Sequence, residues 1–190
     1  MTEQHEALRK FAYQINYAIE NYKPHGLSAS SFSNVLIGGL GGSGIGGRLV
    51  KTIFNDEFPI PVEVVADYTL PAYVNSQTLV ILGSYSGNTE ETLTMFEEVQ
   101  KRGSQMLILT SGGKLGEWAK SNNLTTYNLI PGFQPRMALG FSLTYLVQIF
   151  AELNGSSRTE ELKKISGLFE ETGSYEADAT EMFEQIKHKS

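Results

Sequence analysis

Three hydroxyl side chains lie close together at a point where a strand is expected to turn into a helix. Ser84, Ser86 and Thr89 fall within a six-residue stretch in which Gly87 allows a sharp bend. A branched apolar run precedes this stretch and a helix-forming segment follows it. Hydroxyl groups, together with the unpaired amides at a helix start, can bind a phosphate monoester without bulk positive charge. We therefore predict a phosphate site here, with Gly87 and Asn88 supporting the loop.

The same stretch also has a purely structural interpretation, the capping of the following helix. Ser86 or Asn88 would be the N-cap, and Glu90 and Glu91 would fall in the first turn. Capping and phosphate binding are compatible. Capping alone, however, does not require three hydroxyls ahead of the helix.

A glycine-rich stretch joins an earlier strand to an earlier helix. Seven of the ten residues from Gly38 to Gly47 are glycine. Glycine lets the backbone approach a ligand closely, and the start of a helix favours an anion. In open α/β sheets, ligands bind beyond the carboxyl ends of the strands. We therefore expect an anion to bind at this loop, with Gly41, Gly42 and Gly44 as supporting loop residues.

The glycines leave two other interpretations open. Gly39, Gly41 and Gly44 fit the G-x-G-x-x-G pattern of dinucleotide-binding folds, and Asp67 lies near where such folds place an acid for the ribose. A tight turn with close helix packing needs the same glycines. The hydroxyl-rich second loop favours a phosphate monoester over a dinucleotide. No glycine-lysine-serine/threonine sequence follows the glycines, which disfavours a nucleoside triphosphate.

The elements that must position these loops follow from the apolar patterning. Short apolar runs predict buried strands near residues 35–37, 62–66, 79–82, 106–109 and 125–129. Helical periodicity predicts helices near residues 8–22, 45–55, 88–102, 114–121 and 137–153. Strands that alternate with helices indicate an α/β fold, here a five-stranded parallel sheet flanked by helices in a flavodoxin-like three-layer sandwich.

Taken together and in this order, the motifs resemble those of sugar isomerase (SIS) domains. The likeness is carried by residues 41–48, by residues 84–92 and by residues 135–140, and it spans about residues 34–153. Within that family the chain is most similar to the N-terminal half of bifunctional phosphoglucose/phosphomannose isomerases. The resemblance implies an SIS-type fold for residues 34–153. The apolar patterning predicts a helical segment over 1–33 and, over 154–190, a C-terminal helical extension or a linker to a missing second SIS domain. We expect this extension to pack on a partner chain or on the missing domain.

The resemblance also implies a reaction. Ser43, Ser84, Ser86 and Thr89 would hold a sugar phosphate, and Arg136 would face the reacting carbons. Glucose 6-phosphate or mannose 6-phosphate would interconvert with fructose 6-phosphate through a cis-enediolate, whose negative charge a guanidinium stabilises. Neither a cofactor nor a metal ion is implied. A surface arginine that caps a loop is the structural alternative for Arg136.

Isomerisation needs a base to move a proton between two carbons, and no residue here matches it. In the resembled family a glutamate, a histidine and a lysine come from a second SIS domain. His25, beside Pro24 and Gly26, is expected to be a turn residue. We therefore expect the chain to bind sugar phosphates but to isomerise them poorly, and to form a homodimer or pack on a second SIS domain. A non-catalytic phosphosugar sensor is the alternative, and a dinucleotide-binding enzyme is a less favoured one.

Composition narrows the partners further. The formal net charge is −6, which argues against nucleic acid and anionic membranes as partners. The absence of cysteine excludes disulfides, thiolate metal sites and cysteine nucleophiles. With no apolar leader at the N-terminus, a cytoplasmic location is the default expectation.

Overall fold

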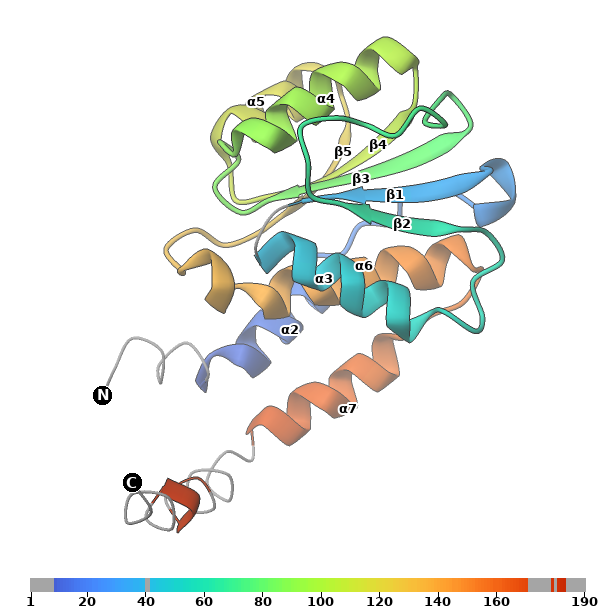
Figure 1. Ribbon diagram of the computed structural model, residues 1–190. Helices are drawn as coiled ribbons and strands as arrows, with labels where there is room; N and C mark the ends of the chain where they lie inside the picture. Colours follow the sequence, from blue (N-terminus) through green and yellow to red (C-terminus); the bar gives the residue numbers. More distant parts are fainter. Residues whose placement is uncertain (1–8, 40–41, 171–178, 180, 184–190) are drawn as a thin grey trace.

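A single parallel sheet lies between two layers of helices in the computed structural model, which describes residues 9–39, 42–170, 179 and 181–183 (Figure 1). The strands are β1 (Asn34–Gly38), β2 (Val62–Val65), β3 (Thr78–Ser84), β4 (Gln105–Thr110) and β5 (Thr125–Asn128). Their order in the sheet is β2-β1-β3-β4-β5, and every pairing is parallel. The predicted five-stranded parallel sheet is therefore confirmed.

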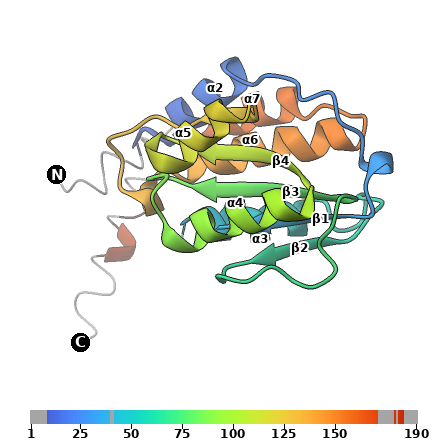
Figure 2. The ribbon, with the colours of Figure 1, turned by 90° about the horizontal axis from the view of Figure 1, so that it is seen from above.

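Helices cover both faces of this sheet. One face carries α2 (Phe11–Glu20), α3 (Gly42–Ile53) and α6 (Leu139–Leu153). The other face carries α4 (Glu90–Arg102) and α5 (Gly113–Ser121), which lie over the strands in Figure 2. Two short 3-10 turns, η1 (Ala29–Ser31) and η2 (Pro135–Met137), lie in the connections before β1 and α6. No helix among the described residues is long and apolar enough to span a membrane.

The central strands are apolar along their whole length because each faces two cores. In β3, Leu79 and Ile81 pack in the core with α6, whereas Val80 and Leu82 pack in the core with α4 and α5. Each of these four side chains is at most 1% exposed. Full burial of one aliphatic side chain contributes roughly 1.5–3 kcal/mol, so this strand alone anchors both helical layers.

The connections after β1 and β3 leave the sheet toward opposite faces. The helix α3 follows β1 and packs on α6, while α4 follows β3 and packs on the other side. The two strands are neighbours, and Gly38 at the end of β1 is in register with Leu82 in β3. A crevice for ligands opens at such a switch point, beyond the carboxyl ends of the strands. The hydroxyl-rich loop and the described part of the glycine-rich stretch therefore follow neighbouring strands and flank this expected crevice.

The segment before α6 is held by a buried glutamine from α2. Gln14 is fully buried, and its Nε2 donates a hydrogen bond of 2.8 Å to the carbonyl of Met137. A Cβ on Gly140 would lie 2.8 Å from the Cβ of Gln14, so the glycine allows α2 this close to α6. The helix predicted over 137–153 is observed from Leu139, because Met137 belongs to the 3-10 turn that precedes it.

The last described helix packs on the chain's own N-terminal helix. In α7 (Thr159–Glu170), the Ser166 hydroxyl donates to the Ala12 carbonyl at 3.2 Å, and the Phe169 ring lies 4.8 Å from the Phe11 ring. We expected the C-terminal extension to pack on a partner chain or a missing domain. For one face of α7 that expectation is wrong. Leu162 and Ser166 on this face are buried within the chain itself, where α7 packs on α2.

Candidate functional site

The hydroxyls at the end of β3 form a pair. Ser84 Oγ lies 2.8 Å from Thr89 Oγ1 and also accepts a hydrogen bond from the Gly87 N–H at 3.1 Å. Only one hydrogen lies between the two hydroxyl oxygens, so the other hydroxyl hydrogen remains available to a further acceptor. Ser84 is buried and Thr89 is half-buried. The pair therefore forms a fixed donor at the inner wall of the crevice.

Ser86 offers a second donor farther out. It is exposed, and its Oγ accepts a hydrogen bond from the Asn88 N–H at 3.2 Å, which leaves the hydroxyl hydrogen free to donate. Asn88 supports the neighbouring loop, because its Oδ1 accepts from the Lys114 N–H at 3.0 Å in the first turn of α5. The structure thus brings Ser84, Ser86 and Thr89 together in one corner, as their spacing predicted.

The proposed capping of α4 by Ser86 or Asn88 is wrong. The N-cap is Thr89, and its side chain makes no capping bond to the helix. The Thr89 hydroxyl bonds Ser84 instead, and the Asn88 amide caps α5. The helix start keeps its anion-favouring dipole, with Glu90 and Glu91 in the first turn.

Gly87 locks this corner against the next loop of the sheet. Its φ is +68°, and a Cβ at this position would lie 1.8 Å from the Gly112 carbonyl oxygen. The Gly87 carbonyl accepts a hydrogen bond of 2.9 Å from the Leu115 N–H. Two loops from neighbouring strands therefore touch through their backbones, which makes the corner rigid.

The glycine-rich corner is described only in part. The Gly39 N–H donates to the Val65 carbonyl at 3.1 Å, so the chain stays in the sheet up to that residue. A Cβ on Gly44 would lie 2.8 Å from the Gly39 carbonyl oxygen, which shows how tightly the helix start folds back. Gly41 lies outside the described residues. The backbones of Gly42 and Ser43 begin α3, but the Ser43 hydroxyl lies outside the description, so its role stays a prediction.

Other glycines of this stretch serve helix packing. A Cβ on Gly47 would lie 3.0 Å from Ile37 Cγ2 and 3.2 Å from Val64 Cγ1, and one on Gly46 would lie 3.3 Å from Leu146 Cδ1. The close approach of α3 to the sheet and to α6 therefore needs both glycines. The structural interpretation of this stretch holds alongside any ligand role.

Arg136 lies in η2, in the connection that follows β5. It is exposed. The loop before it is tied to the hydroxyl corner through Tyr85, whose OH donates to the Ile130 carbonyl at 2.7 Å and accepts from the Phe133 N–H at 2.8 Å. Sequence reasoning missed Tyr85. Its position between Ser84 and Ser86 was a usable signal, because a tyrosine in a partly buried loop needs a hydrogen-bond partner for its hydroxyl.

Asp67 follows β2, where a dinucleotide fold would hold its ribose acid. Its Oδ1 accepts a hydrogen bond of 2.6 Å from the next N–H, that of Tyr68. A hydrogen bond to Glu91 raises the pKa of Tyr68. The loop after β2 thus reaches the start of α4.

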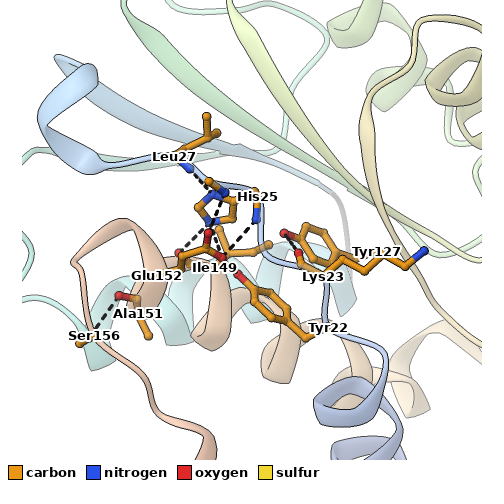
Figure 3. A network of polar contacts seen from close by, with 10 residues as sticks. Tyr22, Lys23, His25, Leu27, Tyr127, Ile149, Ala151, Glu152 and Ser156 are labelled. Carbon is orange, nitrogen blue, oxygen red and sulfur yellow. Dashed lines mark hydrogen bonds and ion pairs between the residues drawn. The ribbon is translucent and has the colours of Figure 1, made fainter.

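His25 lies at the opposite end of α6 from η2, in a polar network drawn in Figure 3. Its Nδ1 accepts from the Leu27 N–H at 3.0 Å, and its Nε2 lies 3.3 Å from the Ile149 carbonyl. Glu152 accepts from the Tyr22 hydroxyl at 2.6 Å and from the Gly26 N–H at 2.7 Å. The helix α6 is about 20 Å long at 1.5 Å per residue. His25 lies in an irregular segment between α2 and η1, and within this chain it stands apart from the crevice.

Comparison with known proteins identifies relatives of this arrangement. Residues 30–130 match the family model described as the SIS domain. The bifunctional phosphoglucose/phosphomannose isomerase of Caldicellulosiruptor bescii is 46% identical over 127 residues, covering 67% of this chain and 38% of that relative. The D-glucosamine-6-phosphate 4-epimerase of Sulfolobus acidocaldarius is 38% identical over 120 residues, covering 63% of this chain and 38% of that relative. Each match thus spans well under half of the relative's length.

A solved structure shows the same fold. The C-terminal domain of glucosamine-fructose-6-phosphate aminotransferase from Francisella tularensis superposes with a TM-score of 0.70 at 14% identity. The match covers 99% of this chain and 58% of that one. At this identity the likeness concerns the chain path and not the site.

Replacing Gly87 should destabilise the fold much more than replacing Gly103, a glycine with nearly the same φ. Gly103 has φ of +69° with nothing near its missing Cβ, so Gly103→Ala should cost about 1 kcal/mol of strain. Gly87→Ala adds the clash with Gly112 and should cost at least about 3 kcal/mol. Urea unfolding of both variants measures the difference. Equal losses would show that the two loops do not touch as described.

Acidification should weaken the fold through His25. Burial lowers the pKa of His25 from its usual 6.5, so the unfolded chain takes up its proton at a higher pH than the folded chain does. The contribution of His25 to the free energy of unfolding is therefore fully present above pH 6.5, and it is lost as the pH falls below that value. In urea unfolding between pH 7.5 and 5.5, the His25→Gln protein should lose less stability than the unsubstituted one. Hydrogen bonds, chiefly from Tyr22, lower the pKa of Glu152 although desolvation opposes them, so Glu152 acts only at lower pH. Parallel pH profiles for the two proteins would contradict this account.

Proposed function

Since the chain belongs to the SIS domain family, we propose that it is the sugar-phosphate-binding domain of an aldose–ketose isomerase. The reaction proposed is the interconversion of glucose 6-phosphate or mannose 6-phosphate with fructose 6-phosphate. One observation carries the proposal: the hydroxyl corner of Ser84, Ser86 and Thr89 lies at the switch point of the sheet. The 46% sequence identity with a phosphoglucose/phosphomannose isomerase, over 67% of this chain, supports the proposal.

The phosphate would be held by donors rather than by lysines or arginines. The Ser84–Thr89 pair has one spare hydroxyl hydrogen and Ser86 has another. The start of α4 adds backbone amides and a favourable dipole. The start of α3, with Ser43, would approach the same phosphate from the other side. Such a site suits a chain whose net charge is negative, because its attraction is local.

Arg136 would act at the other end of the sugar. Aldose–ketose isomerisation develops negative charge on the oxygens of a cis-enediolate. A fixed donor at such an oxygen typically lowers the barrier by roughly 3 kcal/mol. The loop that carries Arg136 is bonded to the phosphate corner through Tyr85, which supports placing both within reach of one small substrate.

The base would come from a further polypeptide segment. In the resembled family it belongs to a second SIS domain, and each of the two relatives is longer than the part matched here. The epimerase relative supports the view that this domain supplies phosphate binding while other residues set the reaction. A phosphosugar sensor would need only the hydroxyl corner to bind its ligand. A loss of ligand affinity on replacing Arg136 would therefore favour an isomerase over a sensor.

The outer side of α3 would receive that second SIS domain or a second copy of the chain. Ile45, Leu49 and Ile53 recur every four residues on this helix and are 50%, 40% and 51% exposed. An exposed apolar stripe of this kind is typical of an interface. Because α3 begins at the glycine-rich corner, a partner on this stripe would lie beside the crevice.

Removing the hydroxyls should weaken binding of fructose 6-phosphate. Ser86→Ala and Thr89→Ala should each raise the dissociation constant about fivefold, which corresponds to one lost hydrogen bond of about 1 kcal/mol. Thr94→Ala is the matched control, since the Thr94 hydroxyl bonds only its own helix at the Glu90 carbonyl. Isothermal titration calorimetry measures all three. Unchanged affinity in both corner variants would refute the phosphate assignment.

A charge placed on α3 should prevent self-association. We expect the purified chain to be a dimer and Leu49→Glu to be a monomer in multi-angle light scattering. Leu168→Glu is the control, because Leu168 is 56% exposed on α7 and lies outside the stripe. A monomeric unsubstituted chain at high concentration, or dissociation by Leu168→Glu alone, would contradict the proposed surface.

A further inference from the structure

Tyr85 connects three loops at the carboxyl edge of the sheet. Its hydroxyl donates to the Ile130 carbonyl and accepts from the Phe133 N–H, at 2.7 Å and 2.8 Å. Its own carbonyl accepts from the N–H of Ser111 at 3.1 Å and from the Ser111 hydroxyl at 2.6 Å. The residue between Ser84 and Ser86 thus holds the loops that follow β4 and β5.

The loop after β5 is attached at its start, in its middle and near its end. At its start, the Leu129 N–H donates to the Thr110 carbonyl at 2.9 Å, and near its end Gln14 bonds the Met137 carbonyl. In the middle, the Phe133 ring packs edge-on against Phe141 with centroids 5.4 Å apart. Tyr85 bonds the backbone on both sides of Gly132, where φ is +95°. Tyr85 therefore fixes the backbone on both sides of Gly132, in the part of the loop that leads into η2.

The chemistry of the proposed reaction requires such a link. The phosphate of fructose 6-phosphate and its reacting carbons lie at opposite ends of the molecule, so an isomerase must hold two groups at a fixed separation. A misplacement of about 1 Å can reduce a rate on the order of a hundredfold. The hydroxyl corner and Arg136 come from different strands, and Tyr85 is the described side chain that bonds one loop to the other.

We propose that Tyr85 is a positioning residue, whose hydroxyl sets the position of Arg136 relative to the phosphate corner. The inference rests on the proposed function, because it assumes that the two groups bind one sugar phosphate. Tyr85 contacts no reacting atom in this account and acts through the loop at residues 130–136. Burial raises the pKa of Tyr85, so the phenol stays protonated and keeps donating to Ile130 at neutral pH.

The test compares two ligands that share the phosphate but differ at the reacting end. Glycerol 3-phosphate needs only the hydroxyl corner. In 5-phospho-D-arabinonate a carboxylate stands where the enediolate oxygens develop, so it also engages Arg136. The ratio of the two dissociation constants reports on the contacts made at the reacting end, and the Arg136→Met variant isolates the part that is due to Arg136. Calorimetry gives this ratio for the full chain.

Tyr85→Phe keeps the ring but removes both hydrogen bonds. It should reduce the preference for 5-phospho-D-arabinonate at least about fivefold, with little change for glycerol 3-phosphate. Arg136→Met should abolish the preference, and adding Tyr85→Phe to it should change nothing more. Tyr127→Phe is the matched control, because that phenol also donates to a backbone carbonyl, Lys23 at 3.1 Å, at the other end of α6. It should keep the full preference.

Three results would overturn the inference. They are an unchanged preference in Tyr85→Phe, an equal loss for both ligands, which marks a general weakening of the corner, and a preference that does not depend on Arg136. A different result would count against the proposed function itself. If the unsubstituted chain binds neither phosphate ester, the phosphate assignment fails before Tyr85 is in question.

Discussion

The opposite departure of α3 and α4 from neighbouring strands is the constraint on which the rest of the structure depends. Because β1 and β3 lie side by side in one register, their carboxyl ends meet; because their helices leave toward opposite faces, the space beyond those ends stays open. The hydroxyl-rich loop lies at the end of β3, and the described part of the glycine-rich stretch lies at the end of β1 and the start of α3. Elsewhere along the sheet, packed apolar layers on both faces hold the strands in place, so the crevice has a rigid frame.

In the proposed function, the crevice would attract an anion without relying on net charge. Its hydroxyls are oriented by one another and by the backbone, and its glycines allow contacts that a side chain would block, such as that between Gly87 and Gly112. Preorganised donors of this kind lose little freedom when a ligand arrives. The same rigidity extends through Tyr85 to the loop of Arg136, so the proposed phosphate binding and the proposed chemistry would depend on the same hydrogen bonds.

The sheet and the hydroxyl corner could be predicted because their signals are local. Runs such as residues 79–82 are apolar throughout, and Ser84, Ser86 and Thr89 lie in one turn. Contacts between distant segments leave no such pattern. The apolar periodicity does not predict the hydrogen bond between Tyr85 and Ile130 or the capping of α5 by Asn88. It also does not predict the hydrogen bond from the Gly26 N–H to Glu152. The packing of α7 on α2 was missed for the same reason, since an amphipathic pattern shows that a helix face is buried but not which element covers it.

Mapping fructose 6-phosphate on the chain by two-dimensional amide NMR tests the central claim most directly. We predict that titration shifts the amide signals of residues 84–89 and of the first turns of α3 and α4, because the phosphate would lie against these groups. Signals near Glu152, at the far end of α6, should stay in place. Saturable shifts confined to another surface, with the corner at residues 84–89 unaffected, would contradict the account.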